Sequence, residues 1–91
     1  MDAGTVKIVL GAIADNKPSQ IEPGEPEQAV AWIKQRISMM GYDKGREAQH
    51  SPSMEAAWKA ADKAVSLYNA GRFDEARPFA AEALKSAFGV G

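Results

Sequence analysis

The amino-acid sequence predicts an all-α protein, a small bundle of three or four helices that ends in an antiparallel helical hairpin. Three observations lead to this prediction. Apolar residues recur at intervals of three and four positions along most of the chain, which is the period of an amphipathic helix. Prolines and glycines separate the periodic segments, as they do at helix ends and turns. One short β-branched run suits a strand, but no second segment exists to pair with it.

The first periodic segment runs from Thr5 to Ala14. Its apolar side chains fall at helical spacing, at Val6, Val9, Leu10 and Ile13. We therefore expect a short helix that begins near Asp2 and ends near Asn16. Because residues 6–10 are also rich in β-branched side chains, a strand that pairs across a dimer is the alternative.

A connecting loop and a second helix follow. Residues 16–25 lack an apolar period and contain two prolines and Gly24, which is typical of a loop. Pro26 fits the first position of the helix, where a missing N–H costs nothing, and Gly41 fits a left-handed stop. The core-facing stripe of this helix consists of Val30, Ile33, Ile37 and Met40.

The third helix follows a second polar loop, residues 42–50. Ser51 and Pro52 make a suitable cap and first position, and the apolar period continues to Ala70. The steps of three and four residues predict a seam like that of a coiled coil, through Met54, Trp58, Ala61, Val65 and Tyr68.

The fourth helix begins almost at once. Gly71 ends the third helix, and the next period runs from Phe73 to Gly89, so the short connection predicts an antiparallel hairpin. Pro78 lies within the first two turns and should bend the helix or reset its start. Small side chains on both helices predict a close approach of their backbones, from Ala57, Ala60, Ala61 and Ala64 on one and Ala76, Ala80, Ala83 and Ala87 on the other.

The turn of this hairpin has a pattern of its own. Leu67 and Tyr68 close one helix, Gly71 makes the turn, and the next helix starts with Phe73-Asp74-Glu75-Ala76 and continues with Ala83-Leu84. This stretch resembles the turn and second helix of a tetratricopeptide repeat, and the resemblance covers residues 58–88. Residues 1–50 carry no second copy, so we do not expect a solenoid. The resemblance implies a helical hairpin suited to protein recognition.

Length and composition limit the classes of protein to consider. The 91 residues fit a single helical domain, residues 1–91, with the order of residues 1–25 left open. Eleven Lys and Arg against twelve Asp and Glu give a formal charge of −1, without the basic excess of most nucleic-acid-binding proteins. The absence of cysteine excludes disulfides and thiol chemistry. No stretch suits a membrane span or a signal peptide, so we expect a cytoplasmic protein without membrane contact.

No group of side chains predicts catalysis or metal binding. His50 is the single histidine, and the nearby Asp43 and Glu47 do not complete a usual ligand set. Ser51 beside the histidine is explained as a helix cap, and it has no orienting group for nucleophilic catalysis. We therefore expect a protein that is not an enzyme and that holds no metal or cofactor.

A small group of basic residues surrounds the end of the second helix. These side chains could contact phosphate and are Lys34, Arg36, Lys44 and Arg46. Asp43 and Glu47 lie among them, so a solvated charged face is the favoured interpretation and nucleic-acid binding the alternative.

Large side chains beside the predicted stripes are candidates for a partner-binding surface. They are Trp32, Met39, Phe73 and Phe79. The first hypothesis is a non-enzymatic helical module or adaptor that binds a partner protein through these residues. The alternatives are a small self-assembling structural subunit of a virion or larger complex, and a protein that associates weakly with nucleic acid.

Overall fold

The computed structural model describes residues 1–41 and 52–89, with side chains placed for residues 1–38 and 54–89. This part of the chain forms four α-helices and one 3₁₀ turn, and it contains no strand. The helices are α1 (Ala3–Ala14), α2 (Glu25–Gly41), α3 (Pro52–Asn69) and α4 (Phe73–Phe88), and the turn is η1 (Pro18–Gln20). The all-α prediction is confirmed. Residues 6–10 are helical, so the strand alternative for them is wrong.

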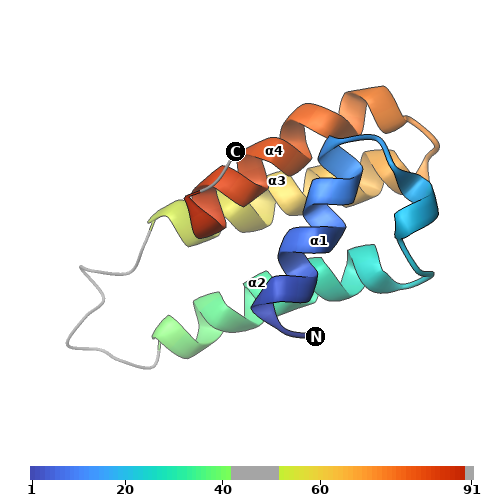
Figure 1. Cartoon of the computed structure of the whole chain (residues 1–91). Helices are drawn as coiled ribbons and strands as arrows, with labels where there is room; N and C mark the ends of the chain where they lie inside the picture. The colour runs from blue at the N-terminus through green and yellow to red at the C-terminus, as the bar shows by residue number, and fades with distance from the viewer. Residues whose placement is uncertain (42–51, 90–91) are drawn as a thin grey trace.

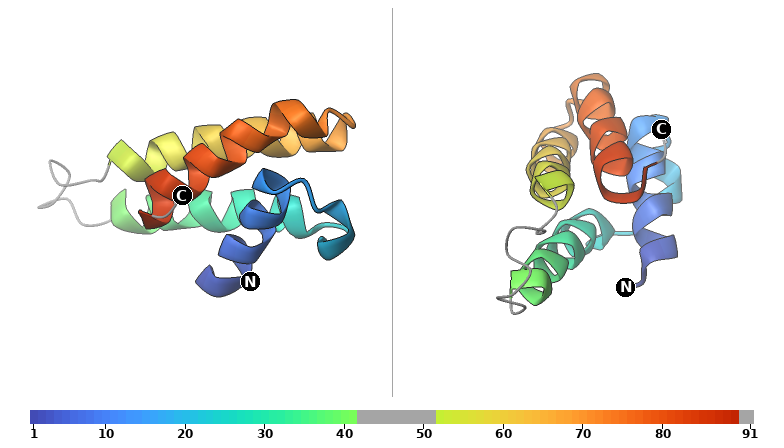
Figure 2. Two further views of the ribbon diagram at one scale, coloured as in Figure 1. Left: turned by 45° about the horizontal axis from the view of Figure 1, so that its top comes forward. Right: turned by 90° about the vertical axis from the view of Figure 1, so that its left-hand side faces the viewer.

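Three of the helices lie side by side and one crosses them (Figure 1). α2, α3 and α4 lie along the long axis of a molecule that measures 42 × 21 × 21 Å, and the chain direction reverses from each of these helices to the next. α3 and α4 share the largest interface, and α2 also packs against α3. α1 crosses at a steep angle and contacts both α4 and α2 (Figure 2). The first helix therefore packs across both α2 and α4.

Side-chain and backbone caps define α1. The Asp2 carboxylate accepts a hydrogen bond of 2.8 Å from the Thr5 N–H and so caps the first turn. At the other end Asn16 has a φ of 56°, and the Lys17 N–H donates back to the Ala12 carbonyl at 2.7 Å. This left-handed closure matches the expected end near Asn16, since Asn tolerates positive φ better than most residues.

The loop after α1 contains a short element of secondary structure. Residues 18–20 make the 3₁₀ turn, which the sequence did not predict. α2 then begins at Glu25, so Pro26 occupies its second position instead of its first. The Glu25 side chain accepts a hydrogen bond of 2.8 Å from the Glu22 N–H, which fixes the entry of the chain into the helix.

The hairpin between α3 and α4 turns at Gly71. Its φ of 80° is a left-handed conformation that glycine adopts without strain. The Arg72 N–H donates to the Leu67 carbonyl at 2.8 Å across the turn, which completes the same closure as at the end of α1. Gly89 ends α4 with a φ of 73°, as its position in the sequence predicted.

Small side chains form much of the core. Ala57, Ala61 and Ala64 of α3 and Ala76, Ala80 and Ala83 of α4 are all fully buried, which confirms the predicted alanine seam. α1 adds the larger apolar residues, Val6, Val9, Leu10 and Ile13. On α2, Ala29 and Ile33 are fully buried, whereas Val30 and Ile37 of the predicted stripe are only half-buried. The side chain of Met40 lies outside the described residues.

Two further features complete the fold. Pro78 sits inside α4, which continues from Phe73 to Phe88 through it. Arg77 ties α4 to α1, because its Nε donates a hydrogen bond of 3.0 Å to the Ala14 carbonyl. None of the helices in the described part of the chain is both long enough and apolar enough to cross a bilayer.

Candidate functional site: a row of cations and aromatic rings

Four side chains from three helices form a continuous row on the surface. We call Lys7, Phe88, Trp32 and Arg36 the cation–aromatic row. The Lys7 ammonium lies 5.1 Å from the centre of the Phe88 ring, and the Arg36 guanidinium lies 5.0 Å from the Trp32 ring. The two rings lie 5.9 Å apart at their centres, tilted by 32°. A cation therefore covers each end of an aromatic pair.

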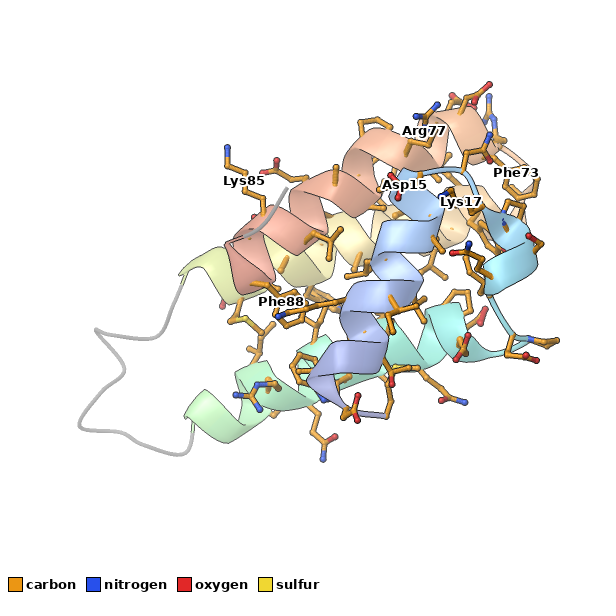
Figure 3. The ribbon with its side chains drawn as sticks, viewed as in Figure 1. Asp15, Lys17, Phe73, Arg77, Lys85 and Phe88 are labelled. Carbon is orange, nitrogen blue, oxygen red and sulfur yellow. The ribbon has the colours of Figure 1, made fainter. Side chains whose placement is uncertain are left out.

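The helices explain why these side chains meet. Trp32 and Arg36 are one turn apart on α2, at the i and i+4 spacing that brings side chains onto one face. Phe88 is the last residue of α4 and extends from its end towards α1 (Figure 3). Lys7 is carried by α1, which crosses next to both helices. The Lys7 end of the row therefore depends on the crossing of α1, whereas Phe88, Trp32 and Arg36 meet directly between α4 and α2.

A shallow cavity lies beside the row. Its volume is about 330 Å³, and it is lined mainly by apolar groups, from Ala3, Trp32, Arg36, Met54, Ala87 and Phe88. Binding pockets for small molecules range from about 300 to 1,000 Å³, so this volume is at the lower limit. The cavity is large enough to receive one apolar side chain of a partner.

The cations of the row are not neutralised by carboxylates within the described part of the chain. Lys7 and Arg36 are exposed and form no ion pair there, while Trp32 and Phe88 are half-buried. Asp2 is the acidic residue nearest in sequence to Lys7, and its carboxylate caps α1. The hydrogen bond from the Thr5 backbone N–H is the main cause that lowers the pKa of Asp2, followed by a hydrogen bond from the Thr5 side chain. That carboxylate is already engaged.

A second hollow lies between α2 and α3. It has a volume of about 300 Å³ and is lined by Lys34, Ile37, Ser38, Glu55, Trp58 and Lys59. The Lys34 ammonium lies 5.7 Å from the centre of the Trp58 ring. Here Glu55 contributes a negative charge between two lysines, and its side chain is not free of partners. This groove is therefore less cationic than the row and is the weaker candidate.

The structure separates the four residues that the sequence suggested for partner binding. Trp32 belongs to the row. Phe73 packs against Tyr68, with ring centres 5.1 Å apart, at the hairpin turn and far from Phe88 (Figure 3). Phe79 is 37% exposed on α4 and contacts neither of the other two rings. The side chain of Met39 lies outside the described residues.

The predicted basic group is divided in a similar way. Lys34 leans towards α3 and Arg36 towards the row, since residues two apart on a helix point to different sides. Lys44 and Arg46 lie outside the described residues, as do His50, Asp43 and Glu47. Among the side chains that the structure places, no three His, Cys, Asp or Glu residues form a set that could hold a metal ion.

Sequence reasoning missed two members of the row, Lys7 and Phe88. Phe88 looks like the end of the alanine seam, and Lys7 looks like an ordinary solvated lysine. The signal in the sequence was weak. It consisted of one large aromatic residue, Phe88, directly before the glycine that ends the helix, after a seam of alanines.

No protein-family model, curated protein or solved structure matches this chain. The resemblance of residues 58–88 to a tetratricopeptide repeat stays a prediction.

Proposed function

We propose that the protein is a non-enzymatic helical module, located in the cytoplasm, that binds a partner protein through the cation–aromatic row. The observation that carries this proposal is the row itself, with its two exposed cations held against two half-buried rings beside an apolar cavity. Tryptophan and arginine are the residue types that contribute most often to the binding energy of protein interfaces.

The chemistry of the row favours a partner that offers both apolar and acidic groups. The cavity can receive one apolar side chain, and burying it would remove apolar surface from water on both partners. Arg36 presents a planar fork of N–H donors that can bind a carboxylate in a bidentate way. An exposed cation over an aromatic ring gains only about 0.5–1 kcal/mol, so the two cations remain able to pair with carboxylates.

A protein partner suits this surface better than nucleic acid. The rings of the row are already covered by cations, which compete with bases for the ring faces. Lys34 and Arg36 point to different sides of α2, so they do not form one continuous track for phosphates. The formal charge of the chain is −1, which also disfavours a polyanion.

The rest of the fold supports this role as a scaffold. The α3–α4 hairpin packs through buried alanines, and α4 carries Phe88 at its end. A site built on packed helices keeps its geometry better than one built on a loop. The row therefore combines exposed charged ends with half-buried rings that the scaffold positions.

Affinity capture with matched charge variants tests the proposal. Wild-type protein and Arg36→Glu would be immobilised and exposed to lysate of the source cells, with Lys63→Glu as the control. Lys63 is exposed on α3 outside the row, so its variant makes the same charge change elsewhere.

We expect proteins that bind wild type and Lys63→Glu but are at least tenfold depleted on Arg36→Glu. Circular dichroism should show equal helicity for all three. Capture that is identical on all three baits, or absent from all three, would overturn the proposal.

A further inference from the structure

We propose that the partner bound by the cation–aromatic row is a second copy of this chain, which inserts Phe79 of its α4 helix. This inference rests on the proposed function, because it uses the same binding surface and names its occupant. A second surface of the molecule carries the charge opposite to that of the row.

That second surface is an acidic stripe with one aromatic residue at its centre. We call Glu75, Phe79 and Glu82 the acidic face of α4. With about 100° of rotation per residue, Glu75 and Glu82 lie within about 60° of Phe79, one turn before and one turn after it. All three are exposed, and Phe79 is 37% accessible. Arg77 and Lys85, the two cations of α4, lie about 160° and about 120° away from Phe79 around the axis.

The charges of the acidic face are only partly satisfied within the chain. Glu75 pairs with Arg72 on the surface, where such a pair contributes little and exchanges easily. Glu82 forms no ion pair with any described residue and stands beside the exposed ring. The row offers two cations and an apolar cavity, so a large apolar side chain flanked by carboxylates is a group that it can bind.

The two surfaces correspond in size and order. The cavity of about 330 Å³ is at the scale of one side chain, and an exposed phenyl ring is a suitable occupant. The row presents a cation at each end of its aromatic pair, and the acidic face presents a carboxylate on each side of its ring. Opposite charges would therefore meet on both sides of the inserted phenylalanine.

The position of the surfaces determines the kind of assembly. Phe79 and Phe88 are nine residues apart on α4, which places them about 180° apart around the helix axis. One copy therefore cannot exchange Phe79 reciprocally with its partner through a single face. The contact is head to tail, and it leaves one free row and one free acidic face at the two ends of every open complex. Such contacts give rings or open chains.

Sedimentation velocity of the full chain over a hundredfold range of concentration tests this proposal. We expect species larger than a dimer to grow with concentration at low salt and to dissociate at about 0.5 M salt, where exposed charges are screened. Arg36→Glu and Phe79→Ala should each weaken association at least tenfold. Phe73→Ala is the control, because Phe73 has nearly the same exposure as Phe79, 36% against 37%, but lies outside both surfaces.

Mixing the two variants gives the most specific result. Arg36→Glu keeps an intact acidic face, and Phe79→Ala keeps an intact row. Each alone should be monomeric, whereas an equimolar mixture should form a complex of two chains and no larger species. Lys7→Glu mixed with Glu82→Gln provides an independent pair, in case either first variant loses helicity.

The outcomes separate this inference from the proposed function. A wild-type chain that stays monomeric over the whole range, or variants that associate as wild type does, would overturn the self-association. If a different protein is then captured in a manner that depends on Arg36, the proposed function stands and only its occupant is wrong. Binding of single-stranded DNA that weakens steeply with salt and requires Arg36 would instead assign the row to nucleic acid.

Discussion

At the scale of single residues, Asp2 shows how one carboxylate holds a helix start. Its oxygen accepts the Thr5 N–H at the positive end of α1. This backbone hydrogen bond, with one from the Thr5 side chain, lowers the pKa of Asp2 below its ordinary value. A carboxyl group whose pKa is lower in the folded state stabilises the fold above its ordinary pKa, and that stabilisation is lost as pH falls through the lowered pKa. The contribution of Asp2 is therefore present at neutral pH and absent in acid.

The substitution Asp2→Ala tests this residue. We expect a lower thermal midpoint than wild type at pH 7, because the first turn of α1 loses its cap. The difference should shrink as the pH falls below about 3.9, the ordinary pKa of aspartate. Thermal melts followed by circular dichroism at pH 7 and pH 2 measure both values.

Asp15→Ala is the matched control, since Asp15 lies at the opposite end of the same helix. Its negative charge there opposes the helix dipole, so its removal should not lower the midpoint at pH 7. An Asp2→Ala deficit of equal size at both pH values would contradict the role of the charge.

At the scale of elements, the α3–α4 hairpin depends on the alternation of buried and exposed alanines. Ala80 is fully buried against α3, whereas its neighbour Ala81 faces solvent. This seam was predictable, because alanines at helical spacing on both sides of a glycine turn leave one arrangement for two antiparallel helices. Trp58 and Tyr68, which the spacing also assigned to this seam, are only half-buried. Large side chains do not fit between two helices whose facing residues are alanines, so they lie at the edges of the interface.

The pair Ala80→Leu and Ala81→Leu tests the hairpin packing. The first places a large side chain between two close backbones and should cost about 1–3 kcal/mol of unfolding free energy. The second makes the same chemical change on the exposed side and should stay within about 0.5 kcal/mol of wild type. Urea denaturation measures both, and equal effects would show that the seam is not tightly packed.

Pro78 offers a second test within α4. Proline cannot donate the backbone hydrogen bond that a residue at this position of a helix makes to the Asp74 carbonyl. Because Pro78 is exposed, Pro78→Ala removes no core contact. We expect the variant to be more stable in urea denaturation, by up to about 3 kcal/mol. A loss of stability would mean that the proline sets the path of the helix.

At the scale of the whole molecule, the crossing of α1 adds large apolar side chains to the core and brings Lys7 to Phe88 on the surface. The helix itself was predictable from its apolar period and from Asp2 and Asn16 at its ends. Its crossing over α2 and α4 was not predictable, because an apolar stripe indicates which face is buried and not against what or at which angle. The contact of Lys7 with Phe88 depends on that angle, so the row could not be found from spacing alone.

Leu10→Ala tests the dependence of the fold on α1. Leu10 is fully buried, and truncation of such a side chain costs about 2–5 kcal/mol. Since a chain of 91 residues has limited stability, we expect partial or complete loss of cooperative unfolding. Ile8→Ala on the same helix is the control, because Ile8 is 64% exposed and should change stability by less than about 0.5 kcal/mol. Comparable melting of Leu10→Ala and wild type would show that α1 is dispensable.

The alanine seam also affects the entropy of folding. A buried leucine or methionine gives up rotamer freedom when it is fixed in a core, at a cost of about 0.5–2 kcal/mol, whereas alanine has no rotamers to lose. The six alanines that meet between α3 and α4 are therefore ordered without that cost. They also offer few methyl groups to remove from water. The hairpin thus gains little from burial and loses little in side-chain freedom, and the larger side chains of α1 supply much of the hydrophobic driving force for the bundle.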